Sequence, residues 1–435
     1  MYICHSNLQE MNLVEELRWR GMLQDIMPGT EELLNKEMVS GYIGFDPTSD
    51  SLHIGSLVPI LLLVHLQKAG HKPYALVGGA TGMIGDPSFK SEERNLLSEE
   101  TLQNNLAGIK KQLSKFLDFT GDAPNKAEMV NNYDWFKDFS FLHFIRDVGK
   151  HITVNYMMSK DSVRKRLDGN TGMSFTEFTY QLIQGYDFYW LYQNKNCKLQ
   201  MGGSDQWGNI VTGTEIIRRK AGGEAFAFTC PLLTKADGGK FGKTENGNIW
   251  LDDKKTPTLE FYQFWLNASD EDTRKWIKIF TFLSESEIET LTKEHFLLPE
   301  KRVLQKRLAQ EITEFVHGKD EFNKVLYLTE VIFKRNSMDL VLSLDEEIFN
   351  PSRISNFISG SILPTDAITF LTDSGSFPSK KEAKYSILSG ALSINDEKIS
   401  DPYKIIDESV YKIKSKFAIV KKGKKKIEII KKSSN

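Results

Sequence analysis

Cysteine is scarce in this sequence, and the few cysteines form no pattern. Cys4, Cys197 and Cys230 are the three cysteines among 435 residues, and they lie far apart with no C-x-x-C pair. Neither a disulfide framework nor a cysteine-based zinc site is therefore indicated, and the usage fits a reducing compartment.

Long apolar runs and targeting signals are missing as well. No apolar run approaches the roughly 20 residues that a membrane-spanning helix needs. The first residues, MYICHSNLQEMNLVEEL, hold no basic segment followed by an apolar one, and their acidic residues come early for a mitochondrial presequence. We therefore expect a cytoplasmic protein with no membrane partner.

Two common nucleotide-binding fingerprints are absent. Gly79, Gly82 and Gly85 match neither the P-loop pattern with its lysine nor the G-x-G-x-x-G pattern of dinucleotide sites. P-loop and nicotinamide-dependent enzymes are therefore disfavoured, and these glycines are individually best explained as turn residues. Asp86, held between Gly85 and Pro87, is a better candidate for binding an amine or a hydroxyl.

The composition that is present is that of an ordinary globular protein. Hydrophobic residues make up 40% and charged residues 26%, and the length allows two or three domains. The formal charge of −2 is unevenly spread, because residues 366–435 hold 15 lysines against 9 acidic residues, which leaves −8 for residues 1–365. A basic C-terminal module of this kind commonly faces nucleic acid or another anionic surface.

The segment Gly41–Leu66 predicts a buried strand, a tight loop and a helix. The strand is the apolar run Tyr42–Phe45, and the first turn of the helix carries His53, Gly55 and Ser56. The free N–H groups at such a helix start favour an anion, and a glycine lets a phosphate or a flat ring approach the backbone. Taken alone, the pattern is as well explained by packing and capping.

Further strand-to-helix turns suggest one open parallel sheet. Residues 74–77 form a second apolar run before the Gly78–Pro87 turn, and residues 199–203 form a third before Asp205 and Gln206. Strand, helix and strand at this spacing imply parallel pairs with crossovers, and such sheets bind ligands at the carboxyl ends of their strands. Asp205 and Gln206 could equally be helix caps.

One predicted helix carries three polar side chains on a single face. Within residues 175–192, Tyr180, Gln184 and Asp187 follow one another at helical spacing. Their burial would be costly unless each met a polar partner, and a ligand with an amine and a hydroxyl would supply those partners. A half-exposed helix face explains the pattern about equally well.

A glycine-rich loop over residues 234–250 carries Lys240 and Lys243 on either side of Phe241-Gly242. Two ammonium groups on a flexible loop are suited to closing over a polyphosphate as its charge shifts in a transition state. The alternative is a solvated surface hairpin, since lysines are mostly exposed.

Other elements complete the prediction. We expect Thr30 to cap a helix, a helix over residues 98–119, a loop and strand-like stretch over residues 131–135, and helices over residues 258–318. A lysine-rich hairpin is expected over residues 415–432. The predicted domains are a catalytic domain (1–235), a lysine loop with a helical region (236–350), a linker (351–364) and a basic RNA-binding domain (365–435).

Several separated segments together resemble the bacterial-type tyrosyl-tRNA synthetases, which are class I aminoacyl-tRNA synthetases. His53-Ile54-Gly55-Ser56 resembles the class signature HIGH, and Lys240-Phe241-Gly242-Lys243-Thr244 resembles the signature KMSKS. Residues 42–48, 78–87, 180–187 and 202–209 are similar to the segments specific to the tyrosine enzyme. The resemblance covers nearly the whole chain.

The resemblance implies a fold, a reaction and partners. The fold is α/β, a doubly wound parallel sheet of the Rossmann-like HUP type, followed by a helical anticodon-binding region and a small α+β domain of the alpha-L RNA-binding type. The reaction joins L-tyrosine and ATP into tyrosyl-adenylate and pyrophosphate, and then transfers tyrosine to the 3′ end of tRNA(Tyr). Mg²⁺ is expected with ATP, without a dedicated protein site, and a homodimer is expected.

The same resemblance assigns residue roles. It assigns tyrosine binding to Tyr42, Asp86, Tyr180, Gln184, Asp187 and Gln206. It assigns ATP and adenylate binding to Gly44, Asp46, His53, Gly55, Ser56, Gly203, Asp205 and Lys243. It assigns catalysis to Thr48, His53, Lys240, Lys243 and Thr244. Tyr42 and Asp187 would bind the phenol, and Asp86, Tyr180 and Gln184 would hold the ammonium group.

Two residues depart from the family pattern. Ser56 replaces the second histidine of HIGH, and Pro59 removes a backbone donor early in the signature helix. The alternatives are a catalytically idle RNA-binding relative, a tRNA synthetase for tryptophan and a small-molecule nucleotidyltransferase. The intact His53, Lys240 and Lys243 argue against the first, and the Tyr42 and Asp187 pair and the basic tail argue against the others.

Overall fold

The computed structural model describes residues 12–86, 97–169, 172–239, 241–244, 247–333, 357–359, 363–413, 416–423 and 426–432. Contacts divide the chain into two units. One comprises Met1–Leu251 with Ser269–Leu304, and the other comprises Asp252–Ala268 with Gln305–Asn435. Among the described residues, no helix is long and apolar enough to cross a membrane.

The first unit is built on a parallel five-stranded sheet in the order β3-β2-β1-β4-β5. Its strands are β1 (Ser40–Phe45), β2 (Lys72–Val77), β3 (Glu128–Asn131), β4 (Cys197–Gly203) and β5 (Phe226–Cys230). All four pairings are parallel. The chain moves outward from β1 to β3 and then returns to β4 beside β1. The strand order therefore reverses between β1 and β4, where open sheets of this kind bind ligands.

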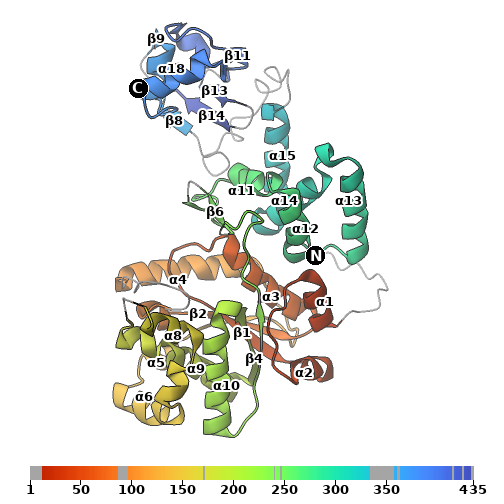
Figure 1. Cartoon of the computed structure of the whole chain (residues 1–435), viewed down its shortest axis with the longest axis vertical. Coiled ribbons are helices and arrows are strands. Elements are labelled where there is room, and N and C mark those ends of the chain that lie inside the picture. The colour runs from red at the N-terminus through yellow and green to blue at the C-terminus, as the bar shows by residue number, and fades with distance from the viewer. Residues whose placement is uncertain are drawn as a thin grey trace. The chain divides into compact units, whose positions relative to one another are not determined.

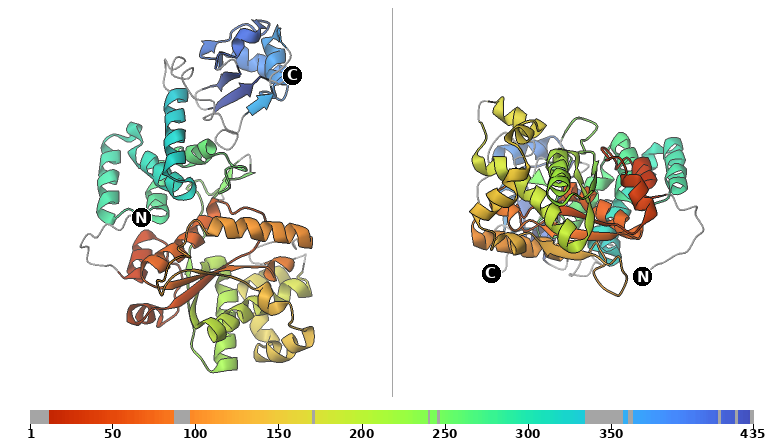
Figure 2. Two further views of the ribbon diagram at one scale, coloured as in Figure 1. Left: turned by 180° about the vertical axis from the view of Figure 1, so that it is seen from behind. Right: turned by 90° about the horizontal axis from the view of Figure 1, so that it is seen from below.

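Helices cover both faces of this sheet, as Figures 1 and 2 show. α3 (Leu57–Lys68) and α4 (Glu99–Leu113) pack on one face, and α9 (Phe175–Lys195) and α10 (Trp207–Ala221) on the other. Two covered faces explain why β2 and β5 are apolar and buried almost throughout, without alternation. The predicted doubly wound α/β fold is confirmed.

Short helices complete the unit. The lead-in holds α1 (Leu13–Arg20) and α2 (Thr30–Lys36). Between β3 and α9 lie α5 (Tyr133–Phe136), α6 (Phe141–Asp147), α7 (Val154–Met158) and α8 (Asp161–Leu167). The loop after β5 contains a two-stranded ribbon of β6 (Lys243–Thr244) and β7 (Gly247–Asn248), and α12 (Asp270–Phe280) and α13 (Glu285–Leu297) follow.

Three local predictions in this unit are wrong. Gly29 rather than Thr30 caps α2, and the Thr30 hydroxyl instead donates to the Met27 carbonyl at 2.7 Å. α4 ends at Leu113, not at 119, because the chain turns and the Asp118 backbone bonds to the Gln67 side chain of α3. The predicted strand-like stretch over 131–135 ends as a strand at Asn131, and residues 133–136 are helical.

The second unit contains helices and a small α+β module. Its helices are α11 (Thr258–Leu266), α14 (Val303–His317) and α15 (Lys319–Phe333). Leu304, Leu308, Ile312 and Val316 are buried along α14, as their spacing predicts.

The module at the C-terminal end is a sheet with two helices. The sheet order is β11-β10-β13-β14-β8, and the helices are α17 (Ala367–Asp373) and α18 (Lys380–Leu388). Its strands are β8 (Phe357–Ser359), β10 (Leu392–Ile394), β11 (Glu397–Lys398), β13 (Phe417–Lys422) and β14 (Lys426–Lys431). A separate two-stranded pair joins β9 (Thr365–Asp366) to β12 (Ile405–Ile406). The predicted hairpin over 415–432 is confirmed as β13 and β14.

The predicted linker lies largely outside the described residues. Within its range, Phe357–Ser359 pairs in parallel with β14, so the terminal sheet includes residues from inside the predicted linker.

Candidate active site

Two adjoining cavities open at the carboxyl ends of β1 and β4. The smaller has a volume of about 250 Å³, and the larger about 830 Å³. Both are lined by Gly44, Asp46, Thr48 and Gly203, so they meet along the ends of the two strands. This is the edge of the sheet at which a ligand was expected.

The smaller cavity gathers every residue that was predicted to bind tyrosine. Its lining includes Tyr42, Asp86, Tyr180, Gln184, Asp187 and Gln206. These side chains come from β1, the turn after β2, α9 and the turn after β4. The spacing argument for one polar face on α9 is therefore confirmed, and that face points into a cavity and not into solvent.

Tyr42 and Asp187 both line this cavity. Both are buried, at 1% and 2% exposure, and the Tyr42 hydroxyl has no hydrogen-bond partner among the described residues. The Asp187 carboxylate accepts from Asn132 Nδ2 at 3.1 Å and from Trp135 Nε1 at 2.9 Å. Burial nevertheless raises the pKa of Asp187 from 3.8 to about 8. The cavity is thus lined by one buried hydroxyl without a described partner and by one buried carboxyl group.

Tyr180 and Gln184 bring acceptor atoms to the same cavity. The Tyr180 hydroxyl donates to Asp46 Oδ2 at 2.8 Å, and Thr81 Oγ1 donates to Asp46 Oδ1 at 2.7 Å. Because Tyr180 uses its only proton on Asp46, its oxygen can only accept from a ligand. Gln184 Oε1 is buried without a described partner, so two neutral acceptors face the cavity.

Asp86 and Gln206 also line this cavity. Gln206 Nε2 donates to Asp86 Oδ2 at 2.8 Å and to Asp205 Oδ2 at 3.2 Å. One amide therefore ties the turn after β2 to the turn after β4. Burial also raises the pKa of Asp205.

The larger cavity is lined by the first signature segment. Its residues include Thr48, His53, Gly55 and Ser56, together with Asp205. His53 precedes a short 3-10 turn (Ile54–Ser56), and its Nδ1 accepts from the Gly55 N–H at 3.0 Å. A neutral imidazole that accepts at Nδ1 carries its proton at Nε2. Ser204, Asp205 and Gln206 likewise form a 3-10 turn, and their side chains do not cap α10.

The second signature segment is described in part. Lys240 lies outside the described residues, and the backbone of Lys243 and Thr244 forms β6. Phe241 lines the larger cavity and stacks on Phe280 with ring centroids 5.3 Å apart. The ring of Trp276 meets the same phenylalanine edge-on at 5.0 Å. The segment before β6 is therefore packed against α12.

Four residues that line the smaller cavity or contact its lining were not predicted from the sequence. Asn132 and Trp135 hold Asp187, Thr81 holds Asp46, and Gln200 lines the cavity with its Oε1 buried and without a described partner. Gln200 lies beside Tyr42 in the parallel register of β1 and β4. The sequence signal that could have identified it is a polar residue between the apolar Leu199 and Met201 of β4.

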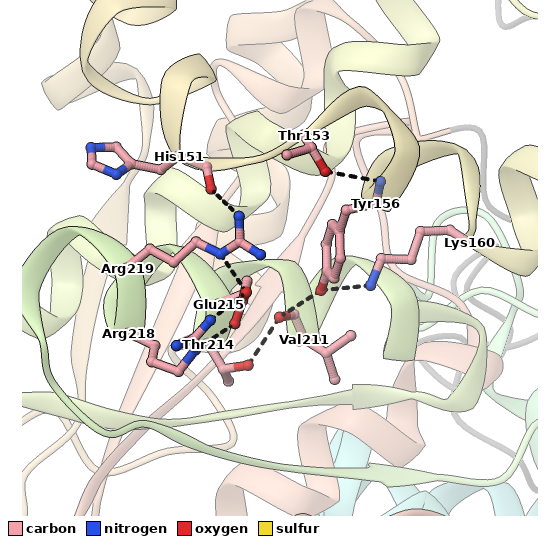
Figure 3. Close-up of polar contacts among 9 residues, drawn as sticks. All are labelled: His151, Thr153, Tyr156, Lys160, Val211, Thr214, Glu215, Arg218 and Arg219. Carbon is pink, nitrogen blue, oxygen red and sulfur yellow. Dashed lines mark hydrogen bonds and ion pairs between the residues drawn. The ribbon is translucent and has the colours of Figure 1, made fainter.

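A second polar cluster lies where α10 meets α7 (Figure 3). The Lys160 ammonium donates to the Tyr156 hydroxyl at 2.8 Å, and the Tyr156 hydroxyl donates to the Val211 carbonyl at 3.2 Å. Burial lowers the pKa of Lys160 to about 8. Glu215 bonds to both Arg218 and Arg219 nearby. None of these residues lines either cavity, so this cluster is separate from the small-molecule site.

No metal-binding cluster is present in the part of the chain that the structure describes. No group of three or more histidine, cysteine, aspartate or glutamate side chains there could hold a metal ion.

Comparison with known proteins identifies the family. The model for "tRNA synthetases class I (W and Y)" matches residues 34–334, and the model for "Tyrosine--tRNA ligase SYY-like C-terminal domain" matches residues 362–430. The chain belongs to the class I tRNA synthetases of the tryptophan and tyrosine group. The first match covers both cavities, and the second covers most of the C-terminal module.

Curated relatives match nearly the whole chain. The tyrosine–tRNA ligase of Bacteroides thetaiotaomicron is 57% identical over 427 residues, which cover 95% of this chain and 98% of that protein. The tyrosine–tRNA ligase of Porphyromonas gingivalis strain W83 is 57% identical over 434 residues, covering 97% of this chain and 99% of that protein.

Solved structures agree with the fold. A C-terminally truncated mitochondrial tyrosyl-tRNA synthetase of Aspergillus nidulans is 32% identical with a TM-score of 0.68, covering 75% of this chain and 95% of that one. A tryptophanyl-tRNA synthetase of Encephalitozoon cuniculi shares the fold at 18% identity and a TM-score of 0.52, covering 71% and 87%.

Proposed function

We propose that this chain activates L-tyrosine with ATP to tyrosyl-adenylate and pyrophosphate, and then transfers tyrosine to the 3′ end of tRNA(Tyr). The observation that carries the proposal is the smaller cavity. Its buried Tyr42 hydroxyl and Gln184 oxygen have no described partner, and Asp187 lines the same cavity. The curated relatives with this activity match at 57% identity over nearly their full length.

We assign the tyrosine contacts by matching donors with acceptors. The substrate phenol can donate to Asp187 and accept from Tyr42. Its ammonium group carries three N–H donors, which fit the Tyr180 oxygen, Gln184 Oε1 and the Asp86 carboxylate. A tryptophan side chain has an N–H donor but no oxygen that could accept from Tyr42, so this pair favours tyrosine.

We assign the larger cavity to ATP. His53 and Thr48 would contact the polyphosphate, and Gly44, Asp46, Gly55, Ser56 and Gly203 would line the adenylate, with Asp205 on its ribose. Gln206, which ties Asp86 to Asp205, would lie near the reacting carboxylate. Lys240, Lys243 and Thr244 would close on the pyrophosphate. Mg²⁺ enters as part of the ATP complex, because the phosphates supply the oxygen ligands that it prefers.

The chemical step needs positioning and charge stabilisation more than proton transfer. The tyrosine carboxylate is already ionised at neutral pH, so its oxygen attacks the α-phosphorus without a general base. The bond from the α-phosphorus to the bridging oxygen breaks, and pyrophosphate leaves with that electron pair. Cationic lysines and the His53 N–H are suited to stabilise the charge on the leaving group.

We propose two further partners. The basic C-terminal module and the helical region would bind the tRNA, which fits the charge of +6 on residues 366–435. A second copy of the chain would cover exposed apolar side chains of α6, α7 and α9, where Phe141, Leu142, Val154 and Phe175 are 59% or more exposed. Sedimentation tests the homodimer, which we place in the cytoplasm.

The activity itself is tested by ATP–pyrophosphate exchange with each of the 20 amino acids. Exchange that depends on tyrosine, with magnesium present, is the expected result. Exchange that depends on tryptophan and not on tyrosine would mean that this chain activates tryptophan instead. Folded protein that binds tRNA but catalyses no exchange would identify an RNA-binding relative without catalysis.

A further inference from the structure

A short stretch, Ile249–Leu251, joins the two signature segments through its backbone. The Ile54 N–H donates to the Ile249 carbonyl at 2.9 Å, and the Leu251 N–H donates to the Leu52 carbonyl at 2.8 Å. On its other side, the Ile249 N–H donates to the Gly242 carbonyl at 3.1 Å. His53 and Trp250 are therefore paired as an antiparallel bridge between these bonds.

The contact between the two signatures is tight at Gly242. Its φ is +82°, a backbone conformation that residues other than glycine rarely adopt. A Cβ at this position would also lie 3.1 Å from Ile54 Cγ1 and 3.6 Å from the Gly55 nitrogen. The backbone of the second signature therefore lies directly against the turn that begins at His53.

Trp250 places an indole ring against the His53 imidazole. The two ring centroids are 6.1 Å apart and the planes meet at 74°, which is an edge-to-face arrangement. Both side chains line the larger cavity, and Trp250 is neither fully buried nor fully exposed. The Gly55 N–H at Nδ1 and the indole ring therefore both restrain the imidazole.

We propose that Trp250 is a positioning residue for the activation step, and that it acts through His53. The indole ring limits rotation of the imidazole, and this keeps the hydrogen bond from the Gly55 N–H to Nδ1. Because Nδ1 accepts that bond, the proton stays on Nε2, the ring nitrogen that can donate to a polyphosphate. The backbone bonds of Ile249 and Leu251 fix Trp250 relative to both signatures. The inference rests on the proposed function, because His53 acts on ATP only there.

A double-mutant cycle tests this role in the full-length protein. Adenylate formation is measured in single turnovers for wild type, Trp250→Ala, Trp250→Phe, His53→Ala and the double variant His53→Ala/Trp250→Ala. Trp250→Ala should slow the step by about ten- to a hundredfold, the range expected for a misplaced catalytic group. Tyrosine affinity should stay within about twofold of wild type, because Trp250 does not line the smaller cavity.

The cycle separates positioning from general damage. In the His53→Ala background, Trp250→Ala should cost less than about twofold, since the group it positions is gone. Trp250→Phe should recover most of the rate, because it keeps an aromatic edge at His53. A full and equal loss in both backgrounds would overturn the proposal, as would weakened tyrosine binding that matches the loss of rate.

Leu251→Ala is the matched control. Leu251 belongs to the same stretch and is 2% exposed, but it does not line the larger cavity. Its truncation should lower the melting temperature, and its effect on rate should add to that of His53→Ala. If Leu251→Ala were coupled to His53→Ala as strongly as Trp250→Ala is, the loss of rate would be due to the Ile249–Leu251 stretch as a whole. That result would contradict a specific role of the indole ring. Wild-type protein without exchange would defeat the proposed function itself.

Discussion

Replacing Trp135 by phenylalanine should weaken tyrosine binding by removing one of two hydrogen bonds that hold Asp187. The indole Nε1 lies 2.9 Å from Asp187 Oδ1, and the other donor is Asn132 Nδ2 at 3.1 Å. A hydrogen bond to a charged group contributes about 1.5–3 kcal/mol. In the proposed function, tyrosine binding requires the ionised form of Asp187. At a pH where Asp187 of the free protein is mostly neutral, loss of the Trp135 bond should therefore reduce tyrosine affinity by about 10- to 150-fold.

The pH dependence of binding makes this prediction sharper. Burial holds the pKa of Asp187 at about 8, so about a tenth of the free protein is ionised there at pH 7. Tyrosine affinity of wild type should rise with pH up to about 8. Without the Trp135 donor the ionised carboxylate loses stabilisation, its pKa rises, and the increase in affinity should move to higher pH. Equilibrium dialysis with labelled tyrosine at several pH values measures both effects.

Trp190→Phe provides the control for Trp135→Phe. The two indoles are stacked with ring centroids 4.3 Å apart, so each substitution replaces one ring of the same stacked pair by a smaller ring. Of the two, only Trp135 donates a hydrogen bond to Asp187. The control should bind tyrosine nearly as wild type does, with an unchanged pH midpoint. Equal losses in the two variants, or an unshifted midpoint in Trp135→Phe, would refute the argument.

Three further outcomes are expected. Because the folded state raises the pKa of Asp187 from 3.8 to about 8, the stability that the neutral carboxyl contributes is present below about pH 4 and is lost as pH rises to 8. The urea midpoint of unfolding of Asp187→Asn, measured relative to that of wild type, should therefore increase between about pH 4 and pH 8. A difference between the two midpoints that does not change with pH would contradict the effect of burial on Asp187. Lys243→Ala should slow activation far more than it weakens tyrosine binding, and equal losses would reject a role in the transition state. A chain that ends at residue 355 should still form adenylate but charge tRNA poorly, and loss of both would mean that the tail is needed for folding.

Much of this site could be predicted because its residues follow local rules. Tyr180, Gln184 and Asp187 share a helix face by periodicity alone, and the structure places all three in one cavity. Turns that end parallel strands lie at the same edge of a sheet, which explains why Asp86 and Gln206 meet although 120 residues separate them.

The residues that escaped prediction are set by contacts distant in sequence. Gln200 lies beside Tyr42 only because β1 and β4 pair in that register, and no local pattern specifies the register. Asn132 and Trp135 reach Asp187 because β3 ends at Asn131 and a short helix follows, where a strand-like stretch was predicted. The wrong secondary structure there concealed both donors.

The smaller cavity divides its polar groups into two sets, and the division itself points to the ligand. Among the described residues, Asp46 and Asp187 each accept hydrogen bonds from two side-chain donors, so both carboxyl groups are held in position before anything binds. The Tyr42 hydroxyl and the Gln184 and Gln200 oxygens are buried without described partners, which costs free energy in the empty protein. A ligand with a hydroxyl at one end and an ammonium group at the other relieves that cost. Phenylalanine, which is otherwise identical, leaves Tyr42 unpaired, so selection against it follows from the same groups that bind tyrosine.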